Sequence, residues 1–145
     1  MGSLNRHVSI IRPSPVALPM ENQVNVALWI VQVFLALAFF GAGFDQALNY
    51  NDAQRRLPWV GTLPRAVATL IGALEILGAI GLIVPAWTGT IPSLTVLSAA
   101  ALAVLMGLAV IFHSRRHELP QLGFSAFFGI LAALVAFGRI VVAPF

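Results

Sequence analysis

Four apolar stretches of about twenty residues each limit what this chain can fold into. They cover approximately residues 24-47, 64-84, 93-113 and 121-142. A helix rises about 1.5 Å per residue, so each stretch can cross the roughly 30 Å hydrocarbon core of a bilayer. Only 9% of the 145 residues are charged, against about a quarter in soluble domains. The pattern predicts an all-α integral membrane protein whose four transmembrane helices form an antiparallel bundle.

The first 23 residues have a different composition from the rest of the chain. They contain Pro13, Pro15 and Pro19 together with Arg6 and Arg12, and closely spaced prolines disfavour a regular helix. We therefore expect an extended polar leader at 1-23 and a single four-helix transmembrane domain at 24-145.

The arginines predict how the helices are oriented in the membrane. The first and third loops carry more of them than the leader and the C-terminal region do, which favours cytoplasmic loops and both termini outside. The first group is Arg55, Arg56, Arg65, Arg115 and Arg116, and the second is Arg6, Arg12 and Arg139. Because the arginines are scattered rather than gathered on one basic face, we expect membrane lipid and no nucleic acid as a partner.

Three polar side chains interrupt the apolar stretches and form a candidate intramembrane site. Glu75 lies near the middle of the second stretch, Gln32 lies within the first, and Arg139 lies near the end of the fourth. Since a charge inside the membrane is costly unless it is paired, we expect these side chains to meet, with Gln32 at nearly the depth of Glu75. They form either a structural cross-link between helices or a site that binds a polar head such as a quinone carbonyl, or relays a proton.

A second polar group is expected where the helices reach the cytoplasmic surface. It comprises Asp45, Arg65, His113, Arg115 and Arg116. Its simplest interpretation is a solvated rim with an ion pair between Asp45 and Arg65, which contributes less than about 1 kcal/mol. The chain has no Cys, which excludes thiolate ligands, and no metal site is expected.

The segment Gly72-Ala-Leu-Glu75-Ile-Leu-Gly78-Ala-Ile-Gly81-Leu-Ile-Val-Pro85 resembles the second-helix signature of the DoxX-like membrane proteins. Three further segments support the resemblance in the same order along the chain: Ala27-Leu-Trp29-Ile-Val-Gln32, His113-Ser-Arg115-Arg116 and Gly138-Arg139. The resemblance implies a four-helix protein of a family linked to oxidoreductase complexes, including a quinone-reducing one. We accordingly expect a location in a bacterial inner (cytoplasmic) membrane.

Three functional hypotheses follow. The first is a non-catalytic accessory subunit that packs against other membrane protein subunits of a larger, redox-type complex. The second is a quinone- or lipid-binding oxidoreductase component that uses Glu75 with Gln32 and Arg139. The third and most distant is an oligomeric transporter.

Overall fold

The structure is a computed structural model that describes residues 20–144. Its elements in chain order are the helix α1 (Met20–Leu48), the short helix α2 (Tyr50–Arg56), the 3-10 turn η1 (Pro58–Thr62), the helices α3 (Arg65–Thr88), α4 (Ser93–Arg115) and α5 (Leu119–Phe137), and the π-helical turn η2 (Gly138–Val142).

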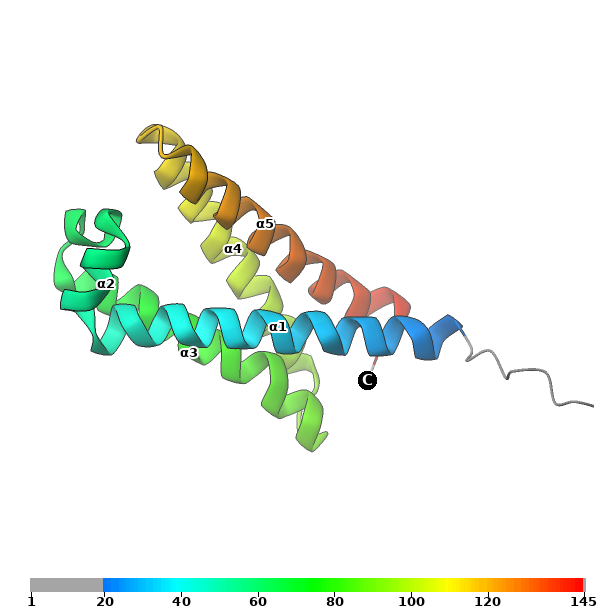
Figure 1. Ribbon diagram of the computed structural model, residues 1–145. Helices are drawn as coiled ribbons and strands as arrows, with labels where there is room; N and C mark the ends of the chain where they lie inside the picture. The colour runs from blue at the N-terminus through cyan, green and yellow to red at the C-terminus, as the bar shows by residue number, and fades with distance from the viewer. Residues whose placement is uncertain (1–19, 145) are drawn as a thin grey trace, which may run out of the picture.

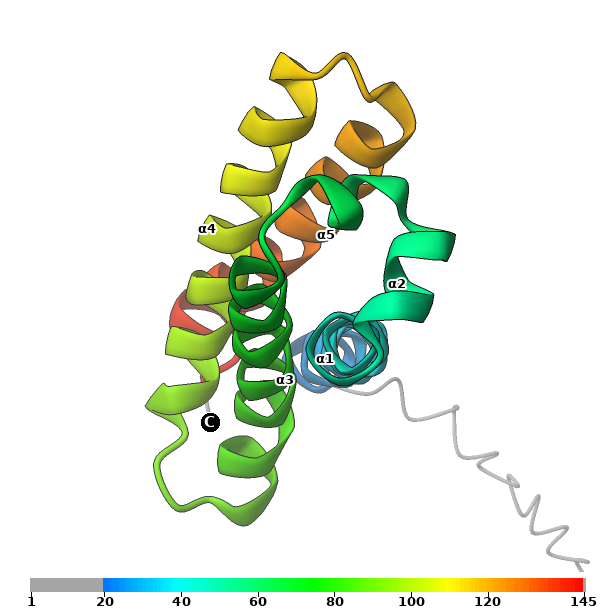
Figure 2. The same ribbon diagram turned by 90° about the vertical axis from the view of Figure 1, so that its left-hand side faces the viewer.

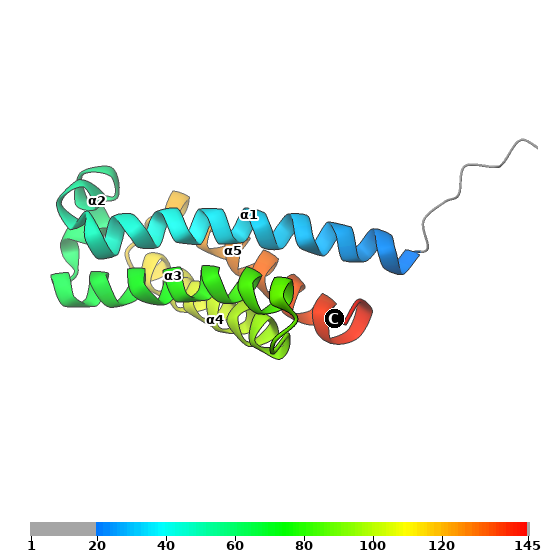
Figure 3. The same cartoon turned by 90° about the horizontal axis from the view of Figure 1, so that it is seen from below.

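Four long helices make up most of the molecule. α1, α3, α4 and the continuous segment formed by α5 and η2 are each long and apolar enough to cross a membrane. Consecutive long helices run in opposite directions (Figures 1 and 3). The prediction of an antiparallel four-helix integral membrane protein is confirmed.

The four helices form two hairpins. α1 packs along α3, α4 packs along α5, and α3 also contacts α4. We call the end of the bundle that carries α2, η1 and the α4–α5 turn the loop end, and Figure 2 looks at this end. Figure 1 shows that the α4–α5 hairpin separates from the α1–α3 hairpin toward the loop end.

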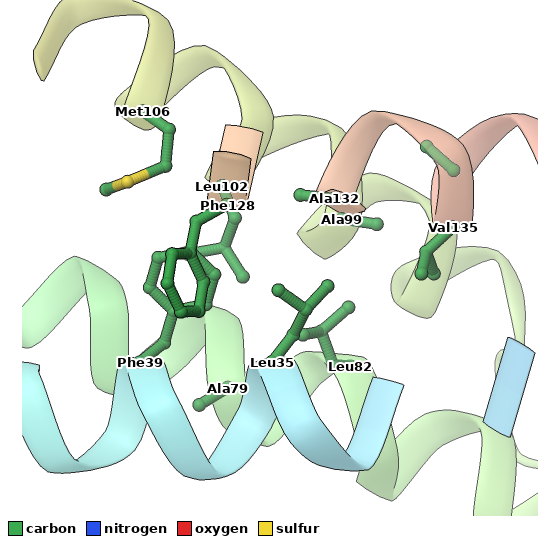
Figure 4. Packing of buried hydrophobic residues seen from close by; sticks show 11 residues of the cluster. Leu35, Phe39, Ala79, Leu82, Ala99, Leu102, Met106, Phe128, Ala132 and Val135 are labelled. Carbon is green, nitrogen blue, oxygen red and sulfur yellow. The ribbon is translucent and has the colours of Figure 1, made fainter. Parts of the chain in front are cut away.

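An apolar core joins the hairpins where they are in contact. Leu35 and Phe39 of α1, Leu82 of α3, Leu102 of α4 and Phe128 of α5 are at most 5% exposed and belong to one cluster (Figure 4). The rings of Phe39 and Phe128 meet edge-on, with their centroids 5.7 Å apart. Since lipid is as apolar as these side chains, close packing rather than exclusion of water holds them together.

Two glycines let α1 and α3 approach closely. A Cβ atom added at Gly72 would lie 2.6 Å from the carbonyl oxygen of Gly43 and 2.8 Å from the backbone nitrogen of Ala47. Both distances are shorter than real Cβ contacts, so only glycine fits at this crossing. Small residues at such contacts are typical of helix association in lipid.

The beginning of α1 differs from the prediction. The helix starts at Met20, four residues before the expected start, so residues 20-23 are helical rather than extended. No proline follows Pro19 until Pro58, which removes the obstacle to a helix here. The rest of the expected leader, residues 1-19, lies outside the described residues.

The predicted second stretch ended at residue 84, before Pro85, but α3 extends beyond this proline. The helix continues to Thr88 and ends at Gly89, whose φ of 67° is left-handed. A proline removes one backbone hydrogen bond to the preceding turn, and this loss is tolerated because Pro85 stands in the last turn of the helix. Gly89 then ends the helix in the manner common for glycine after a C-terminus.

The segment 49-63, expected as a loop, contains α2 and η1. Ala53 and Val60 are buried against Ala68 of α3, with Trp59 packed beside them. This second, smaller apolar cluster explains why the polar segment folds back onto α3 instead of extending into water.

Candidate functional site

Arg139 and Gln32 meet at the end of the bundle opposite the loop end. Arg139 is 2% exposed and lies in η2. Its Nε donates a hydrogen bond of 2.8 Å to Oε1 of Gln32, and Nε2 of Gln32 donates one of 2.8 Å to the carbonyl oxygen of Leu82. One amide side chain therefore links α1, α3 and the last turn of the chain.

Two further side chains hold the guanidinium group of Arg139. Its Nη1 donates a hydrogen bond of 2.6 Å to Oδ1 of Asn25. The group also lies 5.5 Å from the centroid of the Trp29 ring, within range of a cation–π interaction. These contacts form a cross-link between the first part of α1 and η2 near the other end of the described chain. Asn25 is a member of it that the sequence pattern did not indicate.

Glu75 has a different partner from the one expected. It is 4% exposed, and its Oε2 accepts a hydrogen bond of 3.0 Å from Nε2 of Gln46. The side-chain amide of Gln32 is engaged elsewhere: its Nε2 donates to Leu82 and its Oε1 accepts from Arg139. Leu82 lies two helical turns, or about 10 Å, beyond Glu75 on α3, so the expectation that Gln32 lies at the depth of Glu75 is wrong.

Gln46 is a member of the candidate site that the sequence pattern did not indicate. It lies three residues from Gly43 on α1, and its Cβ atom is 3.0 Å from the position of a Cβ at Gly72. The close approach of the two glycines therefore brings Gln46 alongside Glu75, one turn further along α3. The sequence feature that could have indicated Gln46 is its position: it is a polar residue one helical turn after Gly43, at the end of an apolar stretch.

A cavity of about 620 Å³ lies between the two hairpins toward the loop end. Its lining comes from α1, η1, α3, α4 and α5, and most of the lining side chains are apolar. The lining polar side chains are Gln46, Glu75, His113, Gln121 and Ser125. An apolar cavity with a few polar groups is the usual form of a site for a small lipophilic molecule.

Aromatic rings are prominent in the wall of this cavity. Phe39, Trp59, Phe112, Phe124 and Phe128 all line it. The rings of Phe124 and Phe128 have centroids 4.5 Å apart, and the ring of Phe128 contacts that of Phe39 edge-on. Such a wall offers flat surfaces against which a planar ring can pack.

His113 forms the polar boundary of the cavity at the loop end. The residue is 3% exposed, and its Nδ1 lies 2.7 Å from Oε2 of Glu118. Nε of Arg116 donates a hydrogen bond of 2.8 Å to the other carboxylate oxygen of Glu118. The Trp59 ring meets the imidazole edge-on at 5.2 Å between centroids. The carboxylate thus fixes the orientation of a histidine that faces an apolar space.

The pKa of Glu118 lies below its ordinary value. The largest cause is the hydrogen bond from Arg116, followed by the one from His113. Glu118 is therefore ionised at neutral pH. An ionised carboxylate only accepts hydrogen bonds, so Nδ1 of His113 carries the hydrogen in this contact.

Of the other members of the expected cytoplasmic cluster, Arg116 joins His113 through Glu118, whereas Asp45, Arg65 and Arg115 do not. Asp45 accepts a hydrogen bond of 2.9 Å from Nη1 of Arg56, rather than pairing with Arg65. The guanidinium of Arg65 lies 5.8 Å from the centroid of the Tyr50 ring, and Arg115 is exposed. The Asp45 contact forms because α2 folds back and brings Arg56 to the end of α1.

Within residues 20–144, no three His, Asp or Glu side chains lie close enough together to hold a metal ion.

Comparison with known proteins identifies the family. The model of the DoxX-like family matches residues 30–135, which covers α1 from Ile30, α2, η1, α3, α4 and most of α5. The comparisons with curated proteins and with solved structures gave no match. The match spans more than two thirds of the chain and includes Glu75, Gln46, His113 and Glu118. The chain is a small integral membrane protein that belongs to the DoxX-like family.

Proposed function

We propose that this protein binds a membrane quinone in the cavity between its two hairpins, with the Glu75–Gln46 pair as a polar contact for the quinone ring. The observation that carries the proposal is the position of this pair. It is a buried, hydrogen-bonded pair in the wall of an aromatic cavity, inside a membrane-spanning bundle.

The lining of the cavity favours a quinone over a phospholipid. Among the described residues, no arginine lines it, so the phosphate of a lipid headgroup would have no cationic partner there. An unpaired charge in an apolar site costs several kcal/mol. A quinone ring is uncharged, carries oxygens that form hydrogen bonds, and has an apolar tail.

The shape of the cavity supports the same class of ligand. Its volume of about 620 Å³ is within the range of sites for small molecules. The aromatic rings of its wall can pack on the faces of a planar ring. A quinone carbonyl only accepts hydrogen bonds, so the proposed contact uses the uncharged carboxyl form of Glu75, whose O–H donates through Oε1 while Oε2 accepts from Gln46. Within residues 20–144, the hydrogen bond of Glu75 to another side chain is the one to Gln46 through Oε2.

Replacement of Glu75 by Leu tests the proposal, because Leu keeps a similar volume and removes the hydrogen-bonding group. The full chain would be extracted in mild detergent, and bound quinone and phospholipid would be quantified by mass spectrometry. We expect quinone with the wild-type protein and about tenfold less with Glu75→Leu, since one hydrogen bond contributes about 1 kcal/mol and about 1.4 kcal/mol is a tenfold change in affinity. The matched control is Glu21→Leu, the same change at an exposed position near the start of α1.

Equal quinone content in the wild-type protein and in Glu75→Leu would contradict the proposed contact. Retention of phospholipid without quinone would favour the lipid-binding alternative. Both outcomes are distinct from a folding defect, because the helical content of each variant is measured by circular dichroism in the same samples.

The hypothesis of an accessory subunit in a larger redox-type complex stays a prediction. It is compatible with quinone binding, since such a subunit can supply a quinone site while another subunit supplies the redox centre. The native mass of the particle extracted from its own membrane tests it. A large, reproducible assembly is expected, whereas a single small species would contradict it. The transporter hypothesis also stays a prediction.

A further inference from the structure

Two hydrogen-bond acceptors on residues that line the cavity have no hydrogen-bond partner among residues 20–144. The first is Oε1 of Gln46, which is buried without a hydrogen bond while Nε2 of the same amide is held by Glu75. The second is Nε2 of His113. Within residues 20–144 the imidazole makes its hydrogen bond through Nδ1.

The contact with Glu118 decides which ring nitrogen of His113 carries the hydrogen in the neutral imidazole. Because the ionised Glu118 carboxylate accepts the hydrogen of Nδ1, a neutral imidazole has a bare Nε2 with a lone pair. Arg116 neutralises Glu118 on its other oxygen, and Trp59 restricts the ring from one side. The histidine is thus oriented by a carboxylate in the way that metal-binding and catalytic histidines often are.

We propose that Nε2 of His113 and Oε1 of Gln46 accept hydrogen bonds from ligand hydroxyl groups, so that the cavity binds the hydroquinone form in preference to the quinone form. This inference rests on the proposed function and adds the redox form of the ligand. A quinone carbonyl cannot donate to either acceptor, whereas each hydroxyl group of a hydroquinone can.

The two acceptors come from different hairpins. Gln46 stands on α1 and His113 on α4, and both line the same cavity. A buried acceptor without a partner is unfavourable, so a ligand that donates to it gains more than one that only fills the apolar space. The same reasoning explains why analogues that lack a hydroxyl group are rejected by sites built to bind one.

The test uses the full chain in lipid nanodiscs and a short-tailed quinone. Dissociation constants for the quinone, for its hydroquinone kept reduced under anaerobic conditions, and for the dimethyl ether of the hydroquinone are measured at neutral pH by fluorescence quenching, with empty nanodiscs as the partition control. We expect the hydroquinone to bind about tenfold more tightly than the quinone or the ether. The ether retains the ring and the tail but has no hydroxyl hydrogen.

The variant His113→Asn tests the role of Nε2. Asparagine places an NH₂ group where Nδ1 stands, so it keeps the donor to Glu118 and removes the second nitrogen. We expect it to lose most of the preference for the hydroquinone and to keep its affinity for the quinone within about twofold. His117→Asn is the matched control, since His117 is exposed and has a φ of 57°, which asparagine adopts readily.

The outcomes separate this inference from the proposed function. Binding of neither form would contradict the proposed function. Equal binding of quinone, hydroquinone and ether by the wild-type protein would overturn the present inference alone. An unchanged preference in a folded His113→Asn variant would exclude the role of His113. If that variant does not fold, the comparison of hydroquinone with its ether in the wild-type protein decides the matter.

Discussion

The close approach of Gly43 and Gly72 leads to a quantitative prediction for Gly72→Ala. The added Cβ would lie 2.6 Å from the carbonyl oxygen of Gly43, whereas ordinary contacts begin at 3.4 Å. Helices α1 and α3 must therefore separate by about 0.8 Å, the difference between these distances. Because both close atoms belong to the backbone, no side chain can rotate away to relieve the contact.

The separation has two costs. Overpacking of a well-packed contact costs about 1–3 kcal/mol. It also pulls Gln46 away from Glu75, whose 3.0 Å hydrogen bond would become too long, and a hydrogen bond between membrane helices contributes about 0.6 kcal/mol. Relative to a glycine-to-alanine change without a close contact, we expect a loss of about 2–4 kcal/mol in the free energy of unfolding, together with loss of the bound ligand.

The assay is reversible unfolding in mixed micelles of increasing denaturing detergent, followed by circular dichroism. Alanine has a higher helix propensity than glycine by about 1 kcal/mol, so the comparison requires a control with the same gain. Gly41→Ala provides it, because nothing lies within 4 Å of a Cβ at this exposed position. If Gly72→Ala were as stable as Gly41→Ala, the close approach of α1 and α3 would be refuted.

Two further predictions concern the polar groups outside the cavity. Gln32→Leu removes the acceptor of Arg139 Nε and the donor to the Leu82 carbonyl. We expect it to lower the free energy of unfolding by about 1–3 kcal/mol, measured in the same assay. The control is Val33→Leu at the exposed neighbouring position, and a change no larger than the control's would contradict the cross-link. The lowered pKa of Glu118 means that its stabilisation of the α4–α5 turn is present above the ordinary value of 4.5 and is lost as the pH falls through the lowered value. The fluorescence of Trp59, which contacts His113, should therefore change below pH 4.5 in the wild-type protein and not in Glu118→Gln, and an identical titration in both would contradict the contact.

The sequence was sufficient to predict the four membrane-spanning helices because each one requires about twenty apolar residues, and no other structure satisfies the backbone in lipid. The first residue of α1 and the last residue of α3 differ from the predicted helix boundaries. Pro85 was expected to end α3, but one lost hydrogen bond in a last turn does not stop a helix. The fold of α2 and η1 depends on contacts with Ala68, which lies on another element.

The members of the candidate site were partly predictable. Glu75, Gln32 and Arg139 were expected to be buried, because polar residues in apolar helices seldom face lipid, and all three are buried. Their partners were not predictable. Which residues lie at the same depth depends on where each helix begins and how the helices cross. Gln32 lies about two helical turns from Glu75 along the bundle. It therefore contacts Leu82 and Arg139, while Glu75 contacts Gln46.

The cavity itself has no signature in the sequence. It exists because the hairpins separate toward the loop end (Figure 1), and the position of one pair of helices relative to another is not encoded in the apolar period of either. His113 was expected at a solvated rim, but the turn that brings Glu118 back to Nδ1 buries it at the cavity instead.

The most direct test of the proposed function is to locate a bound quinone on the protein. A photoreactive quinone analogue would be added to the full chain in lipid nanodiscs, irradiated, and its attachment sites mapped by mass spectrometry with excess unlabelled hydroquinone as competitor. We predict labelling of cavity residues such as Met106, Ala109 and Phe128 that the competitor suppresses. Labelling confined to outward-facing residues such as Leu37 and Ile130, and unaffected by the competitor, would show that the quinone is dissolved in the surrounding lipid and would contradict binding in the cavity.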